Sequence, residues 1–270
     1  MRFRNYFLIF IVILIGIFLS QNITKNKIKN NIDNSISNTP IIENTPESLI
    51  EPKLAYITQE RILDADNEPG NWLSYGRNYE EQRFSPLTQI NKNNIDDLEL
   101  EWSFDMNSTR ALESTPIVED GIMFLTSEWS IVHAIDARTG SEIWVYDPDV
   151  PKDWGRKACC DVVNRGVAVW KGYVFFATLD GRLVKLNAKT GNLVWEIDTL
   201  IDRSRDYTIT GAPRIANDKV FIGNGGAEYG VRGYVSAFDT KSGELAWRFY
   251  TVPGDPSLPF EHTEMELAAK

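Results

Sequence analysis

The stretch Ala134–Trp144, AIDARTGSEIW, returns twice further along the chain, as Lys185–Trp195, KLNAKTGNLVW, and as Ala237–Trp247, AFDTKSGELAW. The glycines in the turns of the three copies, at positions 140, 191 and 243, are 51 and 52 residues apart. In each copy a strand-like run enters a Thr-Gly or Ser-Gly turn, where glycine accepts a positive φ, and a second run leaves the turn and ends in tryptophan. Similarity at one fixed period indicates a repeat architecture.

The segments ahead of the three copies, 120–126, 172–178 and 218–223, supply another predicted strand to each unit. Four-stranded units at a period near fifty predict the blades of a β-propeller, with the tryptophans wedged between neighbouring sheets. We therefore expect an all-β fold with about three to four blades, and Trp102 in LELEWSF predicts the closing strand of a preceding unit. An open β-sandwich is the alternative, but it gives no reason to repeat one tryptophan-terminated turn.

The number of blades suggests a longer protein. Propellers close with typically 4–8 blades, and only about three to four units fit into residues 72–270. The segment 261–270, EHTEMELAAK, also has a helical pattern with no glycine or proline to end it. We expect the chain to be the N-terminal part of a longer propeller protein.

Residues 1–20 predict an export signal. Arg2 and Arg4 precede the apolar run Tyr6–Leu19, whose fourteen residues are fewer than the roughly 20 that a spanning helix needs. No clear cleavage site follows, so retention of residues 6–19 as an inner-membrane anchor stays open beside cleavage. Either alternative predicts a periplasmic protein. Residues 21–60 are expected to be a disordered linker, since 21–53 are polar and lack an amphipathic period, and residues 61–270 the propeller part.

The chain is acidic, with a formal net charge of −10 at pH 7. Nucleic acid binding requires basic stripes that neutralise phosphates, so this composition argues against a nucleic acid partner. Small molecules, cations or basic proteins fit the charge better.

Cys159 and Cys160 are the only cysteines and lie inside Trp154–Gly166, WGRKACCDVVNRG. If oxidised, they close a strained eight-membered ring of a kind that belongs to functional sites more often than to structural crosslinks. If reduced, they are two buried apolar residues. A soft-metal site is disfavoured because neither His133 nor His262 is near in sequence.

Three further segments carry candidate site residues. Glu113 in RALESTP (110–116) is either a solvated edge charge or a site carboxylate, and Thr208 and Thr210 in YTITGAP (207–213) are either ordinary strand threonines or site hydroxyls.

The third segment, 223–234, reads GNGGAEYGVRGY and holds five glycines around Glu228 and Arg232. It is no Walker loop, and its spacing departs from Gly-x-Gly-x-x-Gly. Dense glycine in a strand region indicates close approach of the backbone to a ligand, and a lone carboxylate there suits a hard cation.

Together these motifs closely resemble the pyrroloquinoline-quinone (PQQ) dependent alcohol dehydrogenases, which are exported quinoproteins with eight-bladed propellers. The likeness covers roughly residues 64–270 and includes NWLSYGRNYEEQRFSPL (71–87). A vicinal Cys-Cys followed by Asp-x-x-Asn-Arg-Gly is its most specific part. The sequences of these motifs are more similar to the quinohaemoprotein branch than to the methanol dehydrogenases.

The resemblance implies a cofactor site. Cys159 and Cys160 would form a disulfide against one face of PQQ, and Arg165 would pair with a PQQ carboxylate, which suits its planar guanidinium. The other implied roles are hydrogen bonds to the PQQ rim from Glu113 and Thr210, close lining by Gly225, Gly226 and Ala227, and ligation of Ca²⁺ by Glu228.

The resemblance also implies an activity, the oxidation of primary alcohols to aldehydes by hydride transfer to the quinone C5, with a cytochrome c or a quinone as electron acceptor. Ca²⁺ and a lanthanide both stay open as the metal. The family's asparagine ligand, catalytic aspartate and stacking tryptophan match nothing in residues 1–270 and are expected beyond Lys270. No Cys-x-x-Cys-His motif occurs in this stretch to attach a haem.

Two other functions suit parts of the pattern. A non-catalytic propeller scaffold explains the repeats but gives no reason for Cys159, Cys160, Arg165 and Glu228. A quinoprotein sugar dehydrogenase suits the fold but not the vicinal cysteines.

Overall fold

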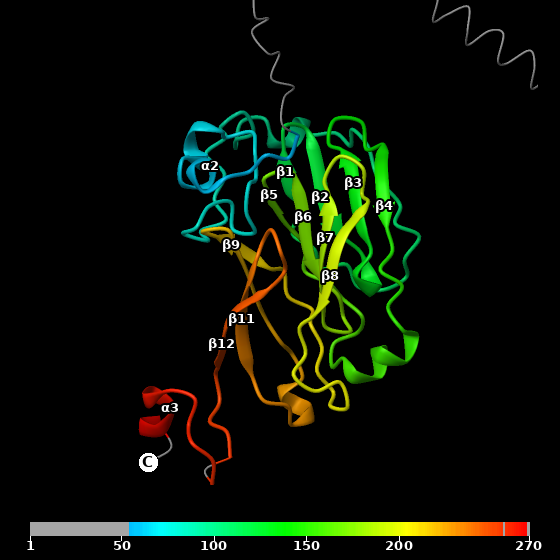
Figure 1. Cartoon of the computed structure of the whole chain (residues 1–270). Coiled ribbons are helices and arrows are strands. Elements are labelled where there is room, and N and C mark those ends of the chain that lie inside the picture. The colour runs from blue at the N-terminus through cyan, green and yellow to red at the C-terminus, as the bar shows by residue number, and fades with distance from the viewer. Residues whose placement is uncertain (1–53, 256, 269–270) are drawn as a thin grey trace, which may run out of the picture. The chain divides into compact units, whose positions relative to one another are not determined.

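The structure is a computed structural model of the chain and describes residues 54–255 and 257–268. Within these residues the strands form three antiparallel four-stranded sheets, each made of strands that are consecutive in sequence (Figure 1). The strands are β1 (Ile117–Glu119), β2 (Ile122–Thr126), β3 (Val132–Asp136), β4 (Glu142–Tyr146), β5 (Ala168–Trp170), β6 (Tyr173–Ala177), β7 (Arg182–Asn187), β8 (Leu193–Asp198), β9 (Arg214–Ala216), β10 (Lys219–Gly223), β11 (Tyr234–Asp239) and β12 (Leu245–Tyr250). The predicted export signal, residues 1–20, lies outside the described residues.

Short helices lie between and beside the sheets. The α-helices are α2 (Gln59–Leu63) and α3 (Thr263–Ala268), and the 3₁₀ helices are η1 (Ala65–Asn67), η2 (Ile95–Asp97), η3 (Glu128–Ser130), η4 (Lys152–Lys157) and η5 (Ala227–Tyr229). Helix α3 confirms the helical pattern predicted near the end of the chain. In the part of the chain that the structure describes, no helix has the length and apolar character to cross a membrane.

The three sheets share one construction. Each begins with a three-residue strand, and each has a register shift between its third and fourth strands at the same point of the repeat. These shifts fall between Ala134 and Ile135, between Lys185 and Leu186, and between Ala237 and Phe238. The predicted four-stranded units are confirmed, with three of them in the described residues.

Tryptophans join successive units. Each indole Nε1–H donates to a backbone carbonyl in the next turn: Trp102 to Ala137 at 3.2 Å, Trp144 to Ala188 at 2.9 Å, and Trp195 to Lys241 at 3.2 Å. Each ring also lies against that turn's glycine, so that a Cβ added to Gly191 would come within 2.8 Å of the Trp144 ring. The predicted wedging of these three tryptophans is confirmed.

The strand predicted to end at Trp102 is not formed. The backbone of residues 98–104 pairs with no strand among the described residues, and a β-strand exists only by pairing. Leu100, in the middle of this segment, is 82% exposed. Trp102 nevertheless contacts the following turn as the later tryptophans do.

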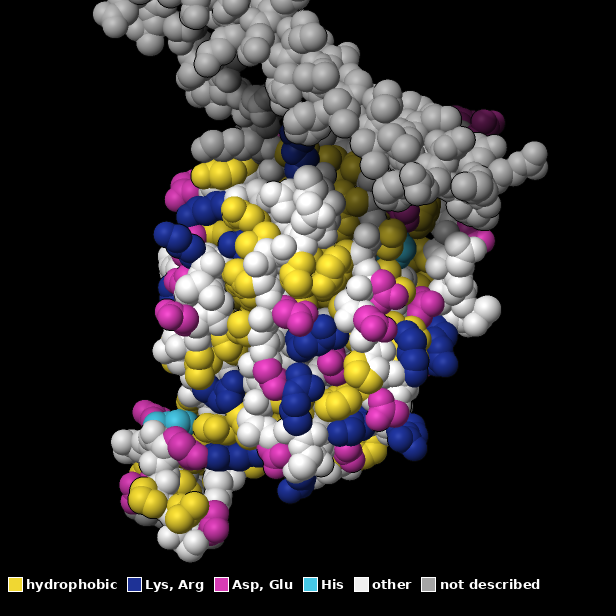
Figure 2. All heavy atoms as spheres, turned by 45° about the vertical axis from the view of Figure 1, so that its right-hand side comes forward, with side chains coloured by type: hydrophobic (Ala, Val, Ile, Leu, Met, Phe, Trp, Pro, Cys, Tyr) yellow, Lys and Arg dark blue, Asp and Glu magenta, His cyan; other side chains and the backbone are white. Residues whose placement is uncertain are grey.

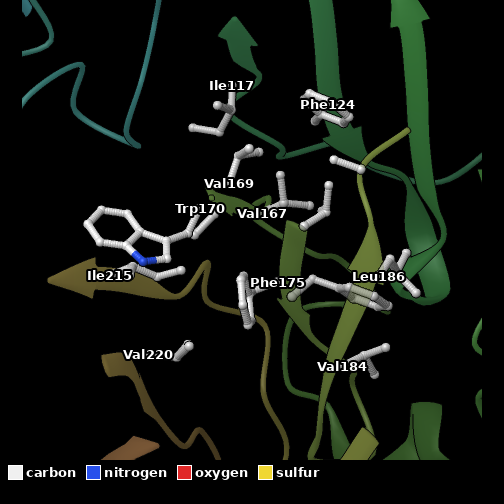
Figure 3. Packing of buried hydrophobic residues seen from close by; sticks show 14 of the residues in the cluster. Ile117, Phe124, Val167, Val169, Trp170, Phe175, Val184, Leu186, Ile215 and Val220 are labelled. Carbon is white, nitrogen blue, oxygen red and sulfur yellow. The ribbon is translucent and has the colours of Figure 1, made fainter. Parts of the chain in front are cut away.

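The main hydrophobic core fills the space between the sheets. It draws side chains from the first three strands of each sheet, including Phe124, Phe175 and Val220, which are 0% exposed (Figure 3). Burying one such side chain contributes about 1.5–3 kcal/mol. On the face that Figure 2 shows, acidic and basic side chains of the described residues are interspersed.

The folded region begins before residue 61. Ala55 and Ile57 are 0% exposed, and their carbonyls accept hydrogen bonds from Gly172 N (2.9 Å) and Lys171 N (3.0 Å) in the β5–β6 turn. The sequence placed residues up to 60 in a disordered linker, and this boundary is wrong for residues 54–60 because their apolar side chains complete the core. Residues 21–53 of the predicted linker lie outside the described residues.

Candidate functional site

Three of the sequence motifs lie side by side at one end of the sheets. RALESTP, CCDVVNRG and YTITGAP run up to β1, β5 and β9, the first strands of the three sheets. Backbone hydrogen bonds link them, from Thr115 N to Arg165 O at 3.1 Å and from Arg165 N to Thr210 O at 2.9 Å. Residues about fifty positions apart in the sequence therefore lie next to one another in the hydrogen-bonded loops that precede the three first strands.

The Arg165 side chain connects the three motifs. Its Nη2 lies 2.8 Å from Glu113 Oε2, and its Nη1 donates to Thr210 Oγ1 at 2.6 Å. Glu113 is thus an ion-paired carboxylate rather than an isolated edge charge, and Thr210 is more than an ordinary strand residue. The Arg165 and Glu113 side chains are 36% and 37% exposed, and an ion pair of this exposure contributes only about 0–1 kcal/mol to stability. Its main effect is to orient the guanidinium.

The glycine-rich motif joins this group through Thr208. Thr208 and Gly225 form a β-bridge, in which Gly225 N donates to Thr208 O at 2.6 Å. Gly226 has a φ of 104°, and a Cβ there would lie 2.4 Å from Asp206 O. Close approach of the chain to its own backbone therefore accounts for glycine at 226, where the sequence suggested approach to a ligand.

A cavity of about 440 Å³ opens beside these loops, within the range of small-molecule sites. Arg165, Thr210 and Gly225 line it, together with Arg214. The other lining residues are Ile209, Gly211, Ala212, Phe221, Ile222, Gly223, Asn224 and Val235. Two guanidinium groups on a wall of glycine and aliphatic residues suit a planar ligand that carries carboxylates.

The vicinal cysteines lie on the loop ahead of Arg165. Both are exposed, and their sulfur atoms face each other in the arrangement of a disulfide, with Cα atoms 3.8 Å apart. The alternative of two buried reduced cysteines is wrong for this structure. Asp161, the next residue, forms an ion pair with Arg110 and accepts from Val162 N at 2.8 Å. The cysteines are therefore held near these hydrogen-bonded loops but do not line the cavity.

Ala227 and Glu228 lie in η5, and both are exposed and outside the cavity wall. Among the described residues no three His, Cys, Asp or Glu side chains gather into a metal-binding group. A cation at Glu228 would therefore need ligands besides the His, Cys, Asp and Glu side chains that these described residues place around it.

Three residues of this region were not assigned from the sequence. Arg214 follows YTITGAP directly, lines the cavity and lies 4.0 Å above the Tyr75 ring. Arg110 and Asp161 are inside two of the motifs, and only the structure pairs them. Their positions inside or next to the motifs are the sequence feature that could have assigned them to the site.

The three sheets have the construction of propeller blades, and a cavity lies where the loops before their first strands meet. Residues 72–268 match the family model "PQQ: Glucose/ethanol/alcohol dehydrogenase, beta-propeller domain". The chain is 57% identical over 216 residues to quinohaemoprotein alcohol dehydrogenase ADH-IIG of Pseudomonas putida, covering 80% of this chain and 30% of that protein.

Solved structures agree. The ADH-IIG structure matches with a TM-score of 0.78 at 57% identity, over 80% of this chain and 31% of that one. The quinohaemoprotein alcohol dehydrogenase of Comamonas testosteroni gives 0.77 at 51%, over 80% and 32%. A europium-containing methanol dehydrogenase gives 0.68 at 37%, over 73% and 34%. The chain belongs to the PQQ-dependent quinohaemoprotein alcohol dehydrogenase family, and it spans less than a third of the length of the curated relative above.

Proposed function

We propose that this chain is part of a periplasmic PQQ- and Ca²⁺-dependent dehydrogenase that oxidises primary alcohols to aldehydes by hydride transfer to the quinone C5. The observation that carries the proposal is the Arg165 guanidinium, held between Glu113 and Thr210 at the wall of a cavity in a member of this family. We further propose export through residues 1–20, with membrane association through residues 6–19 if the signal is retained.

Arg165 binds a carboxylate of PQQ in this proposal. Glu113 and Thr210 each hold one terminal nitrogen of the guanidinium, so its plane is fixed before the cofactor enters. A side chain that is already ordered loses less conformational entropy on binding, which favours affinity. Glu113 and Thr210 also hydrogen-bond the PQQ rim, and Gly225, Gly226 and Ala227 lie along it.

The vicinal cysteines and Glu228 complete this chain's share of the site. We propose that Cys159 and Cys160 form a disulfide whose exposed face packs on the flat PQQ ring, and that Glu228 is one oxygen ligand of the metal. Ca²⁺ takes 6–8 oxygen ligands, so one carboxylate supplies a small part of its shell. The europium-containing relative keeps a lanthanide open as the metal.

When bound, PQQ supplies the hydride acceptor, and a cation beside it polarises the quinone. The residues of this chain bind and orient the cofactor, and we propose that the catalytic aspartate lies beyond Lys270. A cytochrome c or a quinone takes up the electrons. The 270-residue chain by itself is therefore expected to be inactive, and dye-linked alcohol oxidation by it in the presence of PQQ and Ca²⁺ would contradict this division of roles.

A chimeric enzyme tests the proposal. This chain would replace the matching 30% of P. putida ADH-IIG, to which it is 57% identical. We expect the chimera to bind PQQ, measured by absorbance titration, and to oxidise primary alcohols in a dye-linked assay that requires added PQQ and Ca²⁺. Unmodified ADH-IIG, treated identically, is the control. A chimera with a native circular dichroism spectrum that binds no PQQ would refute the proposed function.

A further inference from the structure

One position of the repeat differs between the three sheets. Ala134 in β3 and Ala237 in β11 are 0% exposed and pair across the sheet with tryptophans of the next strand. The equivalent residue in β7 is Lys185, which pairs with Trp195 and is only 6% exposed. A lysine is thus buried where the other two sheets hold a methyl group.

The Lys185 ammonium reaches across to the β9–β12 sheet. Its Nζ donates to Thr240 O at 2.9 Å and lies 3.8 Å from the centre of the Tyr173 ring. Burial lowers its pKa, although the charge of Asp239 acts in the opposite direction. An ammonium has three donors, and within the described residues Lys185 has no carboxylate partner. Buried charge of this kind is stabilised by a counter-ion.

A cavity of about 410 Å³ adjoins this ammonium. It lies at the opposite end of the sheets from Arg165, because its wall includes the β5–β6, β9–β10 and β11–β12 turns. The lining residues are Trp170, Lys171, Tyr173, Phe175, Lys185, Asp218, Asp239, Thr240 and Lys241. It combines aromatic surface with three lysines and two aspartates.

Both aspartates of the cavity already have partners. Asp218 accepts from Lys171 Nζ at 2.6 Å and from Trp170 Nε1 at 2.7 Å. Asp239 accepts from Lys219 Nζ at 3.0 Å, and its other oxygen accepts backbone N–H groups of its own turn. Lys241, like Lys185, has no ion pair in the described part of the chain. The cavity therefore carries uncompensated positive charge.

We propose that this cavity binds a small organic carboxylate, with its anionic group on Lys185 Nζ and its apolar body against Tyr173 and Trp170. The hydrogen bond to Thr240 O explains how Lys185 connects two sheets. The ammonium also lies over the rings of Tyr173, Phe175 and Trp195, and these contacts supply no counter-ion for its charge. The aromatic wall favours a carboxylate on an apolar body over inorganic phosphate. This site is separate from the proposed PQQ site and does not depend on it.

Isothermal titration of the 270-residue chain with benzoate tests this site. We expect saturable binding that weakens at least about tenfold in Lys185→Met, because a charge-assisted hydrogen bond is lost. Lys189→Met is the matched control, since Lys189 is an exposed lysine of the same repeat, and it should bind as the wild type does. If Lys185→Met does not fold, Lys185→Ala replaces it, because alanine occupies this position in the other two sheets.

A measurement without variants gives a second test. We expect benzoate to slow the acetylation of Lys185 by acetic anhydride, followed by mass spectrometry, and to leave Lys189 unaffected. Three results would overturn the proposal: benzoate binding weaker than about 10 mM, equal binding by wild type and Lys185→Met, or phosphate binding in preference to benzoate.

Discussion

Replacing Gly191 by alanine should destabilise the protein through two separable effects. Gly191 has a φ of 72°, where an alanine residue is strained by about 1–2 kcal/mol. The added Cβ would also lie 2.8 Å from the Trp144 ring, closer than real Cβ contacts allow. Overpacking of this kind costs about 1–3 kcal/mol. We expect Gly191→Ala to lower the free energy of unfolding by about 2–5 kcal/mol.

Gly121 provides the matched control. It has a φ of 84°, but no heavy atom lies within 4 Å of the position of its added Cβ. Gly121→Ala should therefore show the backbone effect alone, about 1–2 kcal/mol. Urea unfolding followed by far-ultraviolet circular dichroism measures both variants without relying on tryptophan fluorescence.

A double-mutant cycle isolates the steric part. Trp144→Ala removes the ring, so Gly191→Ala in that background should cost no more than Gly121→Ala does. The coupling energy between Trp144 and Gly191 should then be about 1–3 kcal/mol. If Gly191→Ala and Gly121→Ala cost the same, or if removing the ring gives no relief, the wedge is not what requires glycine in this turn.

Other residues give three further predictions. In the chimera, Arg165→Lys should weaken PQQ binding by about 10–100-fold in absorbance titration, because lysine lacks the planar fork of a guanidinium. The same change should alter the free energy of unfolding by no more than about 1 kcal/mol, because the ion pair of Arg165 is partly exposed. Asp239 has its pKa lowered to about 2, first by the backbone N–H of Ser242 and then by Lys219. The stability it contributes is therefore present above about pH 4 and lost toward pH 2, and Asp239→Asn should flatten urea-unfolding stability across that window. Arg61→Met removes the cationic partner of the fully buried Glu119 side chain and should destabilise the protein by about 3–5 kcal/mol in urea, with much of the loss recovered when Glu119→Gln is added.

The sheets could be predicted from the sequence because their signal is local and periodic. A strand, a turn glycine and a tryptophan lie within eleven residues and occur three times, so each unit can be recognised from its own sequence. The strand at Trp102 was predicted from LELEWSF, which has a tryptophan but no turn glycine, and this prediction was wrong. Pairing depends on a neighbouring strand that the local pattern does not specify. The boundary at residue 60 was wrong because Ala55 and Ile57 form no periodic pattern.

The candidate site was less accessible to sequence reasoning. Glu113, Arg165 and Thr210 come from three separate loops, and only the arrangement of the sheets shows that Arg165 lies between the other two. Family resemblance assigned roles to them but did not predict that they would bind each other. Arg214 stands one residue outside its motif, and its place on the cavity wall follows from the path of β9.

The tryptophan-to-turn contacts have a direction. In each of the three, the indole belongs to the earlier segment and the carbonyl that receives it lies 35–46 residues later. During synthesis from the N-terminus, each tryptophan leaves the ribosome before the turn whose carbonyl accepts its hydrogen bond. The indole ring therefore stays exposed to solvent until the next hairpin has been synthesised. Assembly of this protein is therefore expected to proceed blade upon blade in the order of translation, with each finished blade presenting the docking ring for its successor.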